Sequence, residues 1–213
     1  MDKNTTSRQI AEMLLRANAV KLSPAQPFTW ASGWKSPVYC DNRLTLSFPD
    51  IRNYIKTAFC ELVQQAFPGT EAIAGVATAG IPQAALVADL LQLPMLYVRS
   101  KPKGHGRENL IEGEVAPGTS IIVVEDLVST GGSSIKAAQA LQQAGYQVKG
   151  LVAVFTYGFA VADENFARAG IPFQTLTSYG ELLQTALQHH YIKEKDLQSL
   201  QQWRQAPATW GQQ

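Results

Sequence analysis

Short apolar runs alternate with helical patterns through the middle of the chain. The apolar runs are AIAGVA, PMLYVR, TSIIVVEDL and QVKGLVAVFTYG, and the helical stretches between them include IPQAALVADLLQ and SSIKAAQALQQAG. Unpatterned apolar strands need helices over both of their faces, so this alternation is typical of βαβ units and a parallel sheet. The predicted fold class is α/β.

Three further helices are predicted outside this region. The first covers residues 6–19, where apolar residues repeat on one helical face behind the capping candidates Thr5 and Thr6. The second follows the sequence SFPD at 47–50, in which a capping serine precedes a proline and an acid in the first turn. The third covers residues 178–190, and the Gln-rich end QQWRQAPATWGQQ is expected to fray.

Residues 28–43 have a different pattern, with strand-forming residues on both sides of Ser32-Gly33 and a proline further along. This pattern favours a twisted hairpin, which we call the hood, over a central strand. Two aromatic residues in it, Trp30 and Trp34, either stack on a ligand or pack within the hood.

Length and composition bound the possible functions. The 213 residues fit one domain, with the hood mainly in 1–45, a parallel-sheet core at about 46–190 and a C-terminal tail at 191–213. Eighteen Lys and Arg residues against 17 Asp and Glu residues give a net charge of +1, so neither nucleic acid nor a membrane surface is an expected partner.

Other classes of protein are excluded by missing motifs. The two cysteines, Cys40 and Cys60, are too few for a disulfide framework, and a cytoplasmic location is expected because no leader or long apolar run is present. No GxxxxGK[ST] motif occurs, which excludes a P-loop nucleoside triphosphatase.

The segment SIIVVEDLVSTGGSSIKAA combines an acidic pair with a glycine-containing turn. Glu125 and Asp126 end the apolar run, at the position where ligands bind in open α/β sheets. Residues 129–133 follow, and N–H groups and hydroxyls at the start of a helix suit a phosphate monoester. An ordinary βα turn with a serine cap is the alternative. The two carboxylates favour a ligand site, because a ribose phosphate with magnesium offers them hydroxyls and a cation.

Residues 101–118 have no apolar period and predict a long loop. Four fixed positive charges and an imidazole lie within nine residues that contain no acid: Arg99, Lys101, Lys103, His105 and Arg107. Such a stretch is either a solvated charged run or a mobile cover for a pyrophosphate leaving group. Its place beside a predicted phosphate site favours the cover.

The sequence VVEDLVSTGGS resembles, position by position, the signature of type I phosphoribosyltransferases, which bind phosphoribosyl pyrophosphate. The resemblance implies the type I phosphoribosyltransferase fold, a central, mostly parallel sheet flanked by helices. It also implies that Glu125 and Asp126 contact the ribose hydroxyls and that residues 129–133 hold the 5-phosphate.

Two more segments resemble parts of orotate phosphoribosyltransferases. The segment RSKPKGHGRENLIEG resembles their catalytic loop, and FTWASGWKSPVYCDNR resembles their hood. The implied reaction transfers the phosphoribosyl group from phosphoribosyl pyrophosphate to orotate, giving orotidine 5-phosphate and pyrophosphate in pyrimidine (UMP) biosynthesis. The implied cofactor is Mg²⁺, held mainly through phosphoribosyl pyrophosphate, with no metal ligands assigned to the protein. The implied assembly is a homodimer with shared active sites.

The resemblance assigns roles to individual residues. The catalytic residues are Lys103, His105 and Asp126, and Ser129 also contacts orotate. The residues that bind phosphoribosyl pyrophosphate are Arg99, Lys103, His105, Glu125, Asp126, Leu127, Val128, Ser129, Thr130, Gly131, Gly132 and Ser133.

The chain departs from the orotate pattern at several positions. Ala31, Ala79 and Ser100 stand where lysines are common, and no arginine near Tyr157 is available to bind the base carboxylate. Arg43 or Lys35 are the candidates to replace that arginine.

A purine phosphoribosyltransferase and a regulator that senses phosphoribosyl pyrophosphate are the alternatives. The purine enzyme would have a different hood. The net charge and the absence of a helix-turn-helix extension argue against the regulator.

Overall fold

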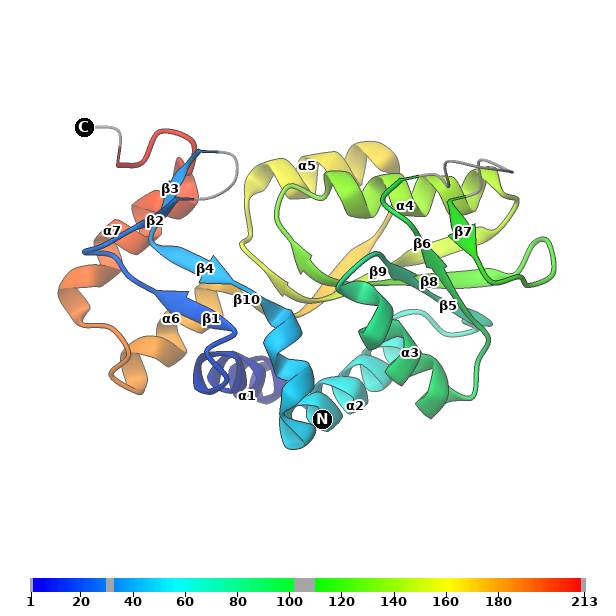
Figure 1. Cartoon of the computed structure of the whole chain (residues 1–213), viewed down its shortest axis with the longest axis horizontal. Helices are drawn as coiled ribbons and strands as arrows, with labels where there is room; N and C mark the ends of the chain where they lie inside the picture. The colour runs from blue at the N-terminus through cyan, green and yellow to red at the C-terminus, as the bar shows by residue number, and fades with distance from the viewer. Residues whose placement is uncertain (1, 30–32, 102–109, 212–213) are drawn as a thin grey trace.

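A computed structural model describes residues 2–29, 33–101 and 110–211 of the chain. Its centre is a six-stranded sheet with the order β10-β9-β8-β5-β6-β7 (Figure 1). The strands are β5 (Ala72–Val76), β6 (Met95–Val98), β7 (Ile111–Glu112), β8 (Ser120–Val128), β9 (Gln147–Thr156) and β10 (Phe173–Ser178). All neighbours are parallel except β6 and β7, which are antiparallel. The predicted α/β class is confirmed.

Helices cover both faces of this sheet (Figure 1). The helices are α1 (Lys3–Arg16), α2 (Pro49–Ala66), α3 (Gly80–Leu91), α4 (Gly132–Gln143), α5 (Ala160–Ala169), α6 (Tyr179–Gln188) and α7 (Glu194–Gln205). Apolar side chains of α1, α2, α3 and α6 share one core cluster with one side of the strands, and those of α4 and α5 share a second cluster with the other side. All five residues of β5 are buried, as expected for a strand covered on both faces.

The hood is built from four short strands. β1 (Val20–Leu22) pairs with β4 (Val38–Cys40), and β2 (Phe28–Thr29) pairs with β3 (Lys35–Ser36), both antiparallel. The predicted hairpin is therefore confirmed. A 3₁₀ helix, η1 (Asn42–Ser47), then leads into α2.

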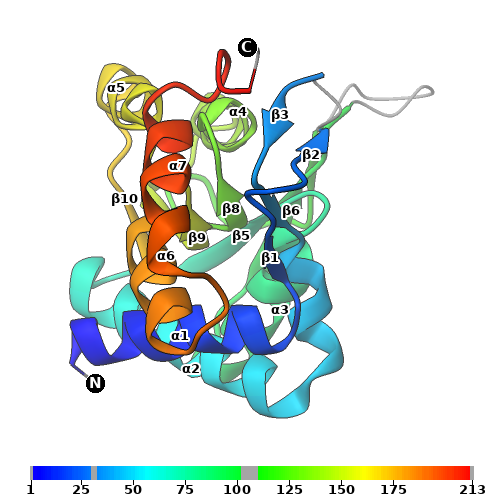
Figure 2. The same ribbon diagram turned by 90° about the vertical axis from the view of Figure 1, so that its left-hand side faces the viewer.

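The C-terminal segment differs from the prediction, because α7 is a regular helix rather than a frayed end. Trp203 of α7 is fully buried, and its ring lies 5.4 Å from Tyr157 and from Phe159 and 5.3 Å from Tyr179, measured between ring centroids. Figure 2 shows α6 and α7 stacked beside the hood, and a Cβ atom on Gly211 would lie 3.5 Å from the side chain of Lys35 in β3. Aromatic burial thus orders a segment whose polar composition suggested disorder.

Three smaller expectations also need correction. Asp2, rather than Thr5 or Thr6, caps α1: its side chain accepts a hydrogen bond from the Thr5 N–H at 3.0 Å. Phe48 occupies the N-cap position of α2 in place of the expected serine. The predicted loop at 101–118 contains a strand, because β7 pairs with the edge of β6.

Candidate active site

A cleft of about 330 Å³ lies at the carboxyl ends of β5 and β8. Its lining residues are Ala77, Thr78, Ala79, Glu125, Asp126, Leu127, Ser129, Thr130, Gly131, Gly132, Ser133 and Ser134. The structure therefore brings the predicted acidic pair and the predicted phosphate turn to one place. The carboxyl ends of parallel strands are the usual ligand site of an open α/β sheet.

The turn between β8 and α4 has the shape of an anion site. Gly131 has a φ angle of +81°, and a Cβ atom there would lie 2.6 Å from the ring of Phe166. Gly132, the first residue of α4, would have no atom within 4 Å of its Cβ, so space is open in front of the helix N-terminus. Free N–H groups of a helix's first turn and the helix dipole both favour a phosphate at this point.

The acidic pair is held from inside the protein. Glu125 is only 5% exposed, and its carboxylate accepts hydrogen bonds from the Asp126 N–H at 3.0 Å and from the Ser134 hydroxyl at 3.2 Å. Asp126 lies beside it and lines the same cleft. The hydrogen bond to Glu125 thus helps to fix the main chain of Asp126, whose side chain faces the cleft.

Burial changes the protonation of this pair. Loss of solvent, and then the negative charge of Asp126, raise the pKa of Glu125 to about 9. Burial also raises the pKa of Asp126, but a hydrogen bond from Glu125 and the positive charge of Arg43 oppose that rise. At neutral pH, Glu125 therefore keeps a proton that it shares with Asp126, and the cleft is less negative than two carboxylates would make it.

The loop before α3 forms the opposite wall of the cleft. It contains Ala77, Thr78 and Ala79 and carries no charged side chain; the peptide bond between Ala77 and Thr78 is cis. A Cβ atom on Gly80 would lie 2.5 Å from the Val124 carbonyl oxygen, so glycine is required for the loop to approach β8 this closely. The loop can offer a ligand its backbone groups and the Thr78 hydroxyl.

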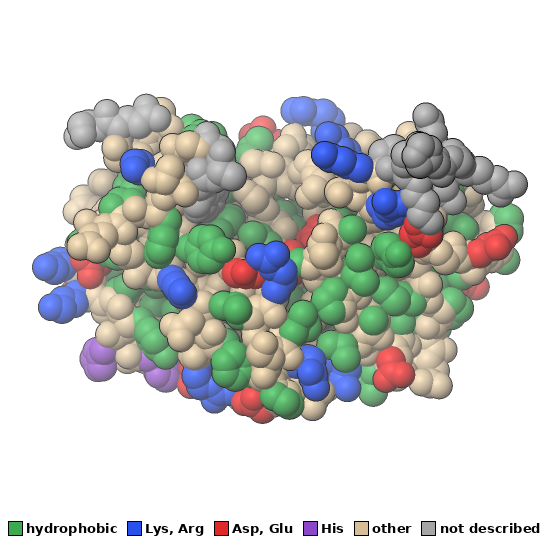
Figure 3. Space-filling view, viewed as in Figure 1, with side chains coloured by type: hydrophobic (Ala, Val, Ile, Leu, Met, Phe, Trp, Pro, Cys, Tyr) green, Lys and Arg blue, Asp and Glu red, His purple; other side chains and the backbone are tan. Residues whose placement is uncertain are grey.

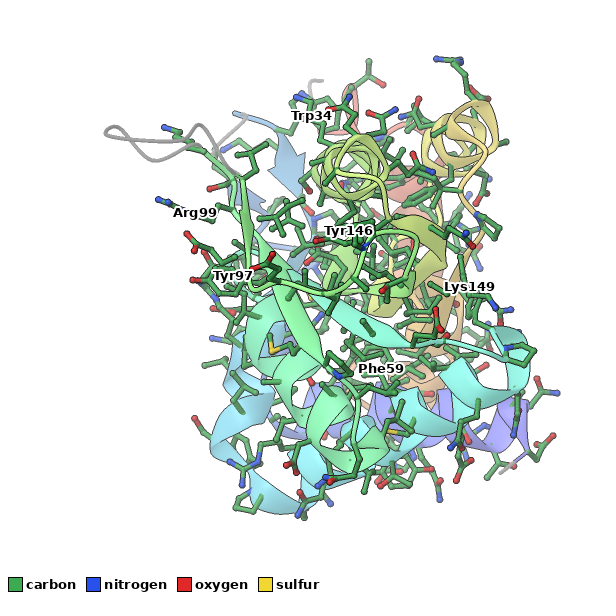
Figure 4. The ribbon with its side chains drawn as sticks, turned by 90° about the vertical axis from the view of Figure 1, so that its right-hand side faces the viewer. Trp34, Phe59, Tyr97, Arg99, Tyr146 and Lys149 are labelled. Atoms are coloured by element: carbon green, nitrogen blue, oxygen red, sulfur yellow. The ribbon has the colours of Figure 1, made fainter. Side chains whose placement is uncertain are left out.

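Two basic side chains lie beside the cleft, in a neighbouring cavity of about 410 Å³. This cavity shares Ala77, Gly132 and Ser133 with the cleft and is lined by Arg99 and Lys136. Arg99 is 31% exposed and lies 3.5 Å from the carboxylate of Glu112 on β7. Figure 4 shows Arg99 past Tyr97 at the end of β6, and Figure 3 shows basic side chains over α4 and near β6 on this face.

The other predicted site residues fall into three groups. Leu127 and residues 129–133 line the cleft, as predicted. The side chain of Val128 is fully buried in the core, which leaves only its main chain for contact with a ligand. Lys103 and His105 lie outside the described residues.

The sequence did not single out several residues that the structure places at the site. Ser134 lines the cleft, and Asn42 and Asn165 donate hydrogen bonds to the main-chain carbonyls of Asp126 and Thr130. Arg43 and Lys35 were the two candidates to bind the carboxylate of the base. The positive charge of Arg43 lowers the pKa of Asp126, and its guanidinium donates hydrogen bonds to the Asp41 carboxylate at 2.7 and 2.8 Å. The spacing of these residues carried no signal, because only the tertiary fold brings them to the acidic pair.

The side-chain atoms of the cleft that could bind a metal ion are all oxygen atoms. Within the described ranges, no three His, Cys, Asp or Glu side chains gather as they would around a metal ion bound by protein alone. The two carboxyls beside the turn between β8 and α4 fit a hard cation that takes most of its ligands from a phosphate substrate.

In the part of the chain that the structure describes, no helix combines the length and the apolar character that crossing a bilayer requires.

The fold and the site together define a type I phosphoribosyltransferase. In agreement, a sequence model described as the phosphoribosyl transferase domain matches residues 48–166. The orotate phosphoribosyltransferase of Cytophaga hutchinsonii is 53% identical over 204 residues, which cover 96% of this chain and 98% of that protein. The enzyme of the same name from Bacteroides thetaiotaomicron is 57% identical over 203 residues, covering 95% and 96% of the two chains.

A solved structure agrees with these relatives. The crystal structure of orotate phosphoribosyltransferase from Aeropyrum pernix superposes with a TM-score of 0.75 at 30% identity, covering 86% of this chain and 99% of that chain. The chain belongs to the orotate phosphoribosyltransferase family. This similarity favours the orotate enzyme over the purine enzyme and the regulator.

Proposed function

We propose that the chain transfers the 5-phosphoribosyl group from phosphoribosyl pyrophosphate to orotate, releasing pyrophosphate and forming orotidine 5-phosphate for pyrimidine biosynthesis. The observation that carries this proposal is the single cleft in which an acidic pair faces a helix N-terminus. Such a cleft offers one set of groups for ribose hydroxyls and another for a phosphate monoester.

The substrate's phosphoribosyl part is assigned to β8 and α4. Residues 129–133 hold the 5-phosphate with backbone N–H groups and hydroxyls, and Asp126 accepts hydrogen bonds from the ribose hydroxyls. Glu125, which retains a proton, keeps the Asp126 carboxylate in place and limits its repulsion of the phosphates. Ser129, the residue after β8, is assigned a contact with orotate.

The pyrophosphate is assigned to the other wall of the cleft. Displacement at the anomeric carbon builds positive charge on the sugar and negative charge on the leaving oxygen. The backbone of residues 77–80 and the guanidinium of Arg99 are placed to meet that oxygen's phosphates. From the sequence, Lys103 and His105 complete this cationic set and exclude water when the loop closes.

A Mg²⁺ ion is proposed as the cofactor. When bound, it supplies positive charge that stabilises the pyrophosphate leaving group. The ribose and phosphate oxygens of the substrate would supply most of its ligands, because the described cleft offers only two carboxyls.

We also propose a cytoplasmic homodimer. Free Cys40 and Cys60 suit a reducing compartment. Apolar side chains are exposed on one face, on η1 and α3 and between η1 and α2: Leu44, Phe48 and Leu90. Figure 3 shows hydrophobic side chains over the same elements. A twofold dimer through such a face would let the loop of one chain cover the cleft of its partner.

Mixing of inactive variants tests the shared site. Lys103→Ala chains and Asp126→Asn chains are combined, and mixed dimers are verified by mass. If sites are shared, each mixed dimer has one site with both changes and one with neither, so activity returns. Mixed dimers that remain inactive would show that each chain uses its own loop.

The proposed reaction is tested by following the ultraviolet absorbance of orotate. Absorbance should fall only when phosphoribosyl pyrophosphate and Mg²⁺ are both present, and Asp126→Asn serves as the negative control. Loss of orotate that continues in excess chelator, or turnover of hypoxanthine but not orotate, would contradict the proposal.

A further inference from the structure

The strand that carries the acidic pair extends beyond its neighbour in the sheet. β8 pairs with β5 from Ile121 to Val124, whereas its pairing with β9 continues to Val128. Glu125 and Asp126 therefore lie on a strand end that β5 no longer supports on one edge. A main-chain carbonyl on such an edge needs another donor if it is buried.

A residue of the hood region supplies that donor. The side-chain amide nitrogen of Asn42, Nδ2, donates a hydrogen bond to the Asp126 carbonyl oxygen at 2.7 Å, although the two residues are 84 positions apart. Asn42 is 1% exposed, so water does not compete for this bond. It therefore replaces, with a side chain, the bond that a neighbouring strand would make.

The orientation of the Asn42 amide is itself fixed. Its Oδ1 atom accepts from the Cys40 thiol at 3.4 Å, and its main-chain carbonyl accepts from the Thr45 hydroxyl at 2.6 Å. The next residue, Arg43, is bound to Asp41 and places a positive charge near the Asp126 carboxylate. The turn that follows β4 thus contacts Asp126 through a hydrogen bond and through charge.

We propose that Asn42 is a positioning residue for the ribose hydroxyls. It holds the main chain of Asp126 so that the carboxylate stays oriented toward the cleft. Through this hydrogen bond it also links the hood to the part of the cleft that binds the ribose. This inference rests on the proposed function, in which Asp126 accepts hydrogen bonds from the ribose.

A second asparagine provides a matched control. Asn165 of α5 donates from Nδ2 to the Thr130 carbonyl at 3.0 Å, so it makes the same kind of bond to the phosphate turn. If each asparagine positions the group it touches, Asn42→Ala and Asn165→Ala will affect different parts of one ligand. A general loosening of the cleft would affect both parts alike.

The experiment compares two ligands, ribose 5-phosphate and 2,3-dideoxyribose 5-phosphate, by titration calorimetry. Their affinity ratio reports the contribution of the ribose hydroxyls, because the phosphate is the same in both. Asn42→Ala is expected to lower this ratio by about three- to tenfold, the range for loss of one hydrogen bond. Asn165→Ala should weaken both ligands equally and leave the ratio unchanged.

A second variant keeps the test valid if Asn42→Ala does not fold. Asn42→Leu has a similar volume, lacks the donor and buries no new charge, and it should lower the ratio about as much. A ratio that stays at the wild-type value in a folded Asn42 variant overturns the positioning role. A wild-type ratio of one, together with no consumption of orotate, overturns the proposed function instead.

Discussion

The phosphate cradle, which comprises the acidic pair and the turn at residues 125–134, and the hood are held in place by contacts of different range. In the cradle, the bond from Ser134 to Glu125 joins residues nine positions apart, and Gly131 turns the chain between them. Around the hood, Asn42 contacts Asp126 across 84 positions, and a Cβ atom on Gly211 would lie 3.5 Å from the Lys35 side chain. One end of the site is therefore formed by a single stretch of chain, and the other by elements from both termini.

This difference has an energetic meaning. A short segment closes its contacts at little loss of chain entropy, whereas distant contacts depend on the rest of the fold for their formation. The aromatic cluster around Trp203 is one of these distant supports, because it joins α7 to the ends of β9 and β10. Changes in the cradle should alter binding and catalysis, and changes around the hood should alter stability as well.

The largest expected effect comes from the cradle. Asp126→Asn should lower kcat/KM for phosphoribosyl pyrophosphate by about 10²- to 10³-fold, because the amide cannot replace a carboxylate that accepts from the ribose hydroxyls. Its melting temperature should stay within about 2 °C of the wild type, because the main-chain bond from Asn42 remains. Steady-state kinetics and calorimetry check both values. A loss of activity below tenfold would contradict the assigned role.

The aromatic support beside the hood comes next. Trp203→Ala should lower the free energy of unfolding by about 3–5 kcal/mol, because it empties a fully buried site among Tyr157, Phe159 and Tyr179. Urea titration measures the change, and Trp203→Phe should lose less than half as much. If Trp203→Ala were as stable as wild type, α7 would not support this end of the molecule.

The wall opposite the acidic pair gives a smaller effect on stability. Gly80→Ala should cost about 1–3 kcal/mol, because its Cβ would lie 2.5 Å from the Val124 carbonyl oxygen. Gly132→Ala is the control, since its Cβ would meet no atom within 4 Å. Denaturant titration of both variants separates close packing from general loss of glycine. Equal effects in the two would show that the approach of the loop to β8 is not tight.

The smallest expected effect concerns Glu125 and pH. The unfolded chain releases this proton near the ordinary pKa of 4.5, while the folded chain keeps it up to about 9. The folded state therefore binds more protons between these values, and the wild type loses stability as pH rises through that window. Glu125→Gln does not titrate, so its stability relative to the wild type should increase as the pH is raised from about 4.5 to about 8.

Thermal unfolding at several pH values checks this prediction. Glu164→Gln on the exposed surface of α5 is the control and should show no such difference. A Glu125→Gln variant whose stability relative to wild type does not change with pH would show that Glu125 is ionised in the fold.

The sequence predicted the parallel-sheet half better than the rest. The apolar runs that became β5, β8 and β9 are buried on both faces, so their pattern alone indicated their structure. β7 was missed because two residues form a strand only where the edge of β6 accepts them. α7 was missed because it buries only Leu200 and Trp203, and the burial of Trp203 is recognised only from the aromatic residues that surround it.

The candidate site divides in the same way. Residues 125–133 form a contiguous motif, and the structure places all of them in or beside one cleft except for the buried side chain of Val128. Asn42 and Asn165 carry no motif, because a side chain that reaches a distant carbonyl is specified by the fold and not by its neighbours in sequence. The part of a site that binds through local backbone is thus the part that sequence can predict.

The most direct test of the account is a competition in one tube. The protein is given phosphoribosyl pyrophosphate, Mg²⁺ and equal amounts of orotate, uracil, hypoxanthine and adenine, and the nucleotides formed are identified by mass. Orotidine 5-phosphate is expected in large excess, and Asp126→Asn should form it about 10²- to 10³-fold more slowly under the same conditions. A purine nucleotide as the main product, or equal amounts of all four nucleotides, would contradict it.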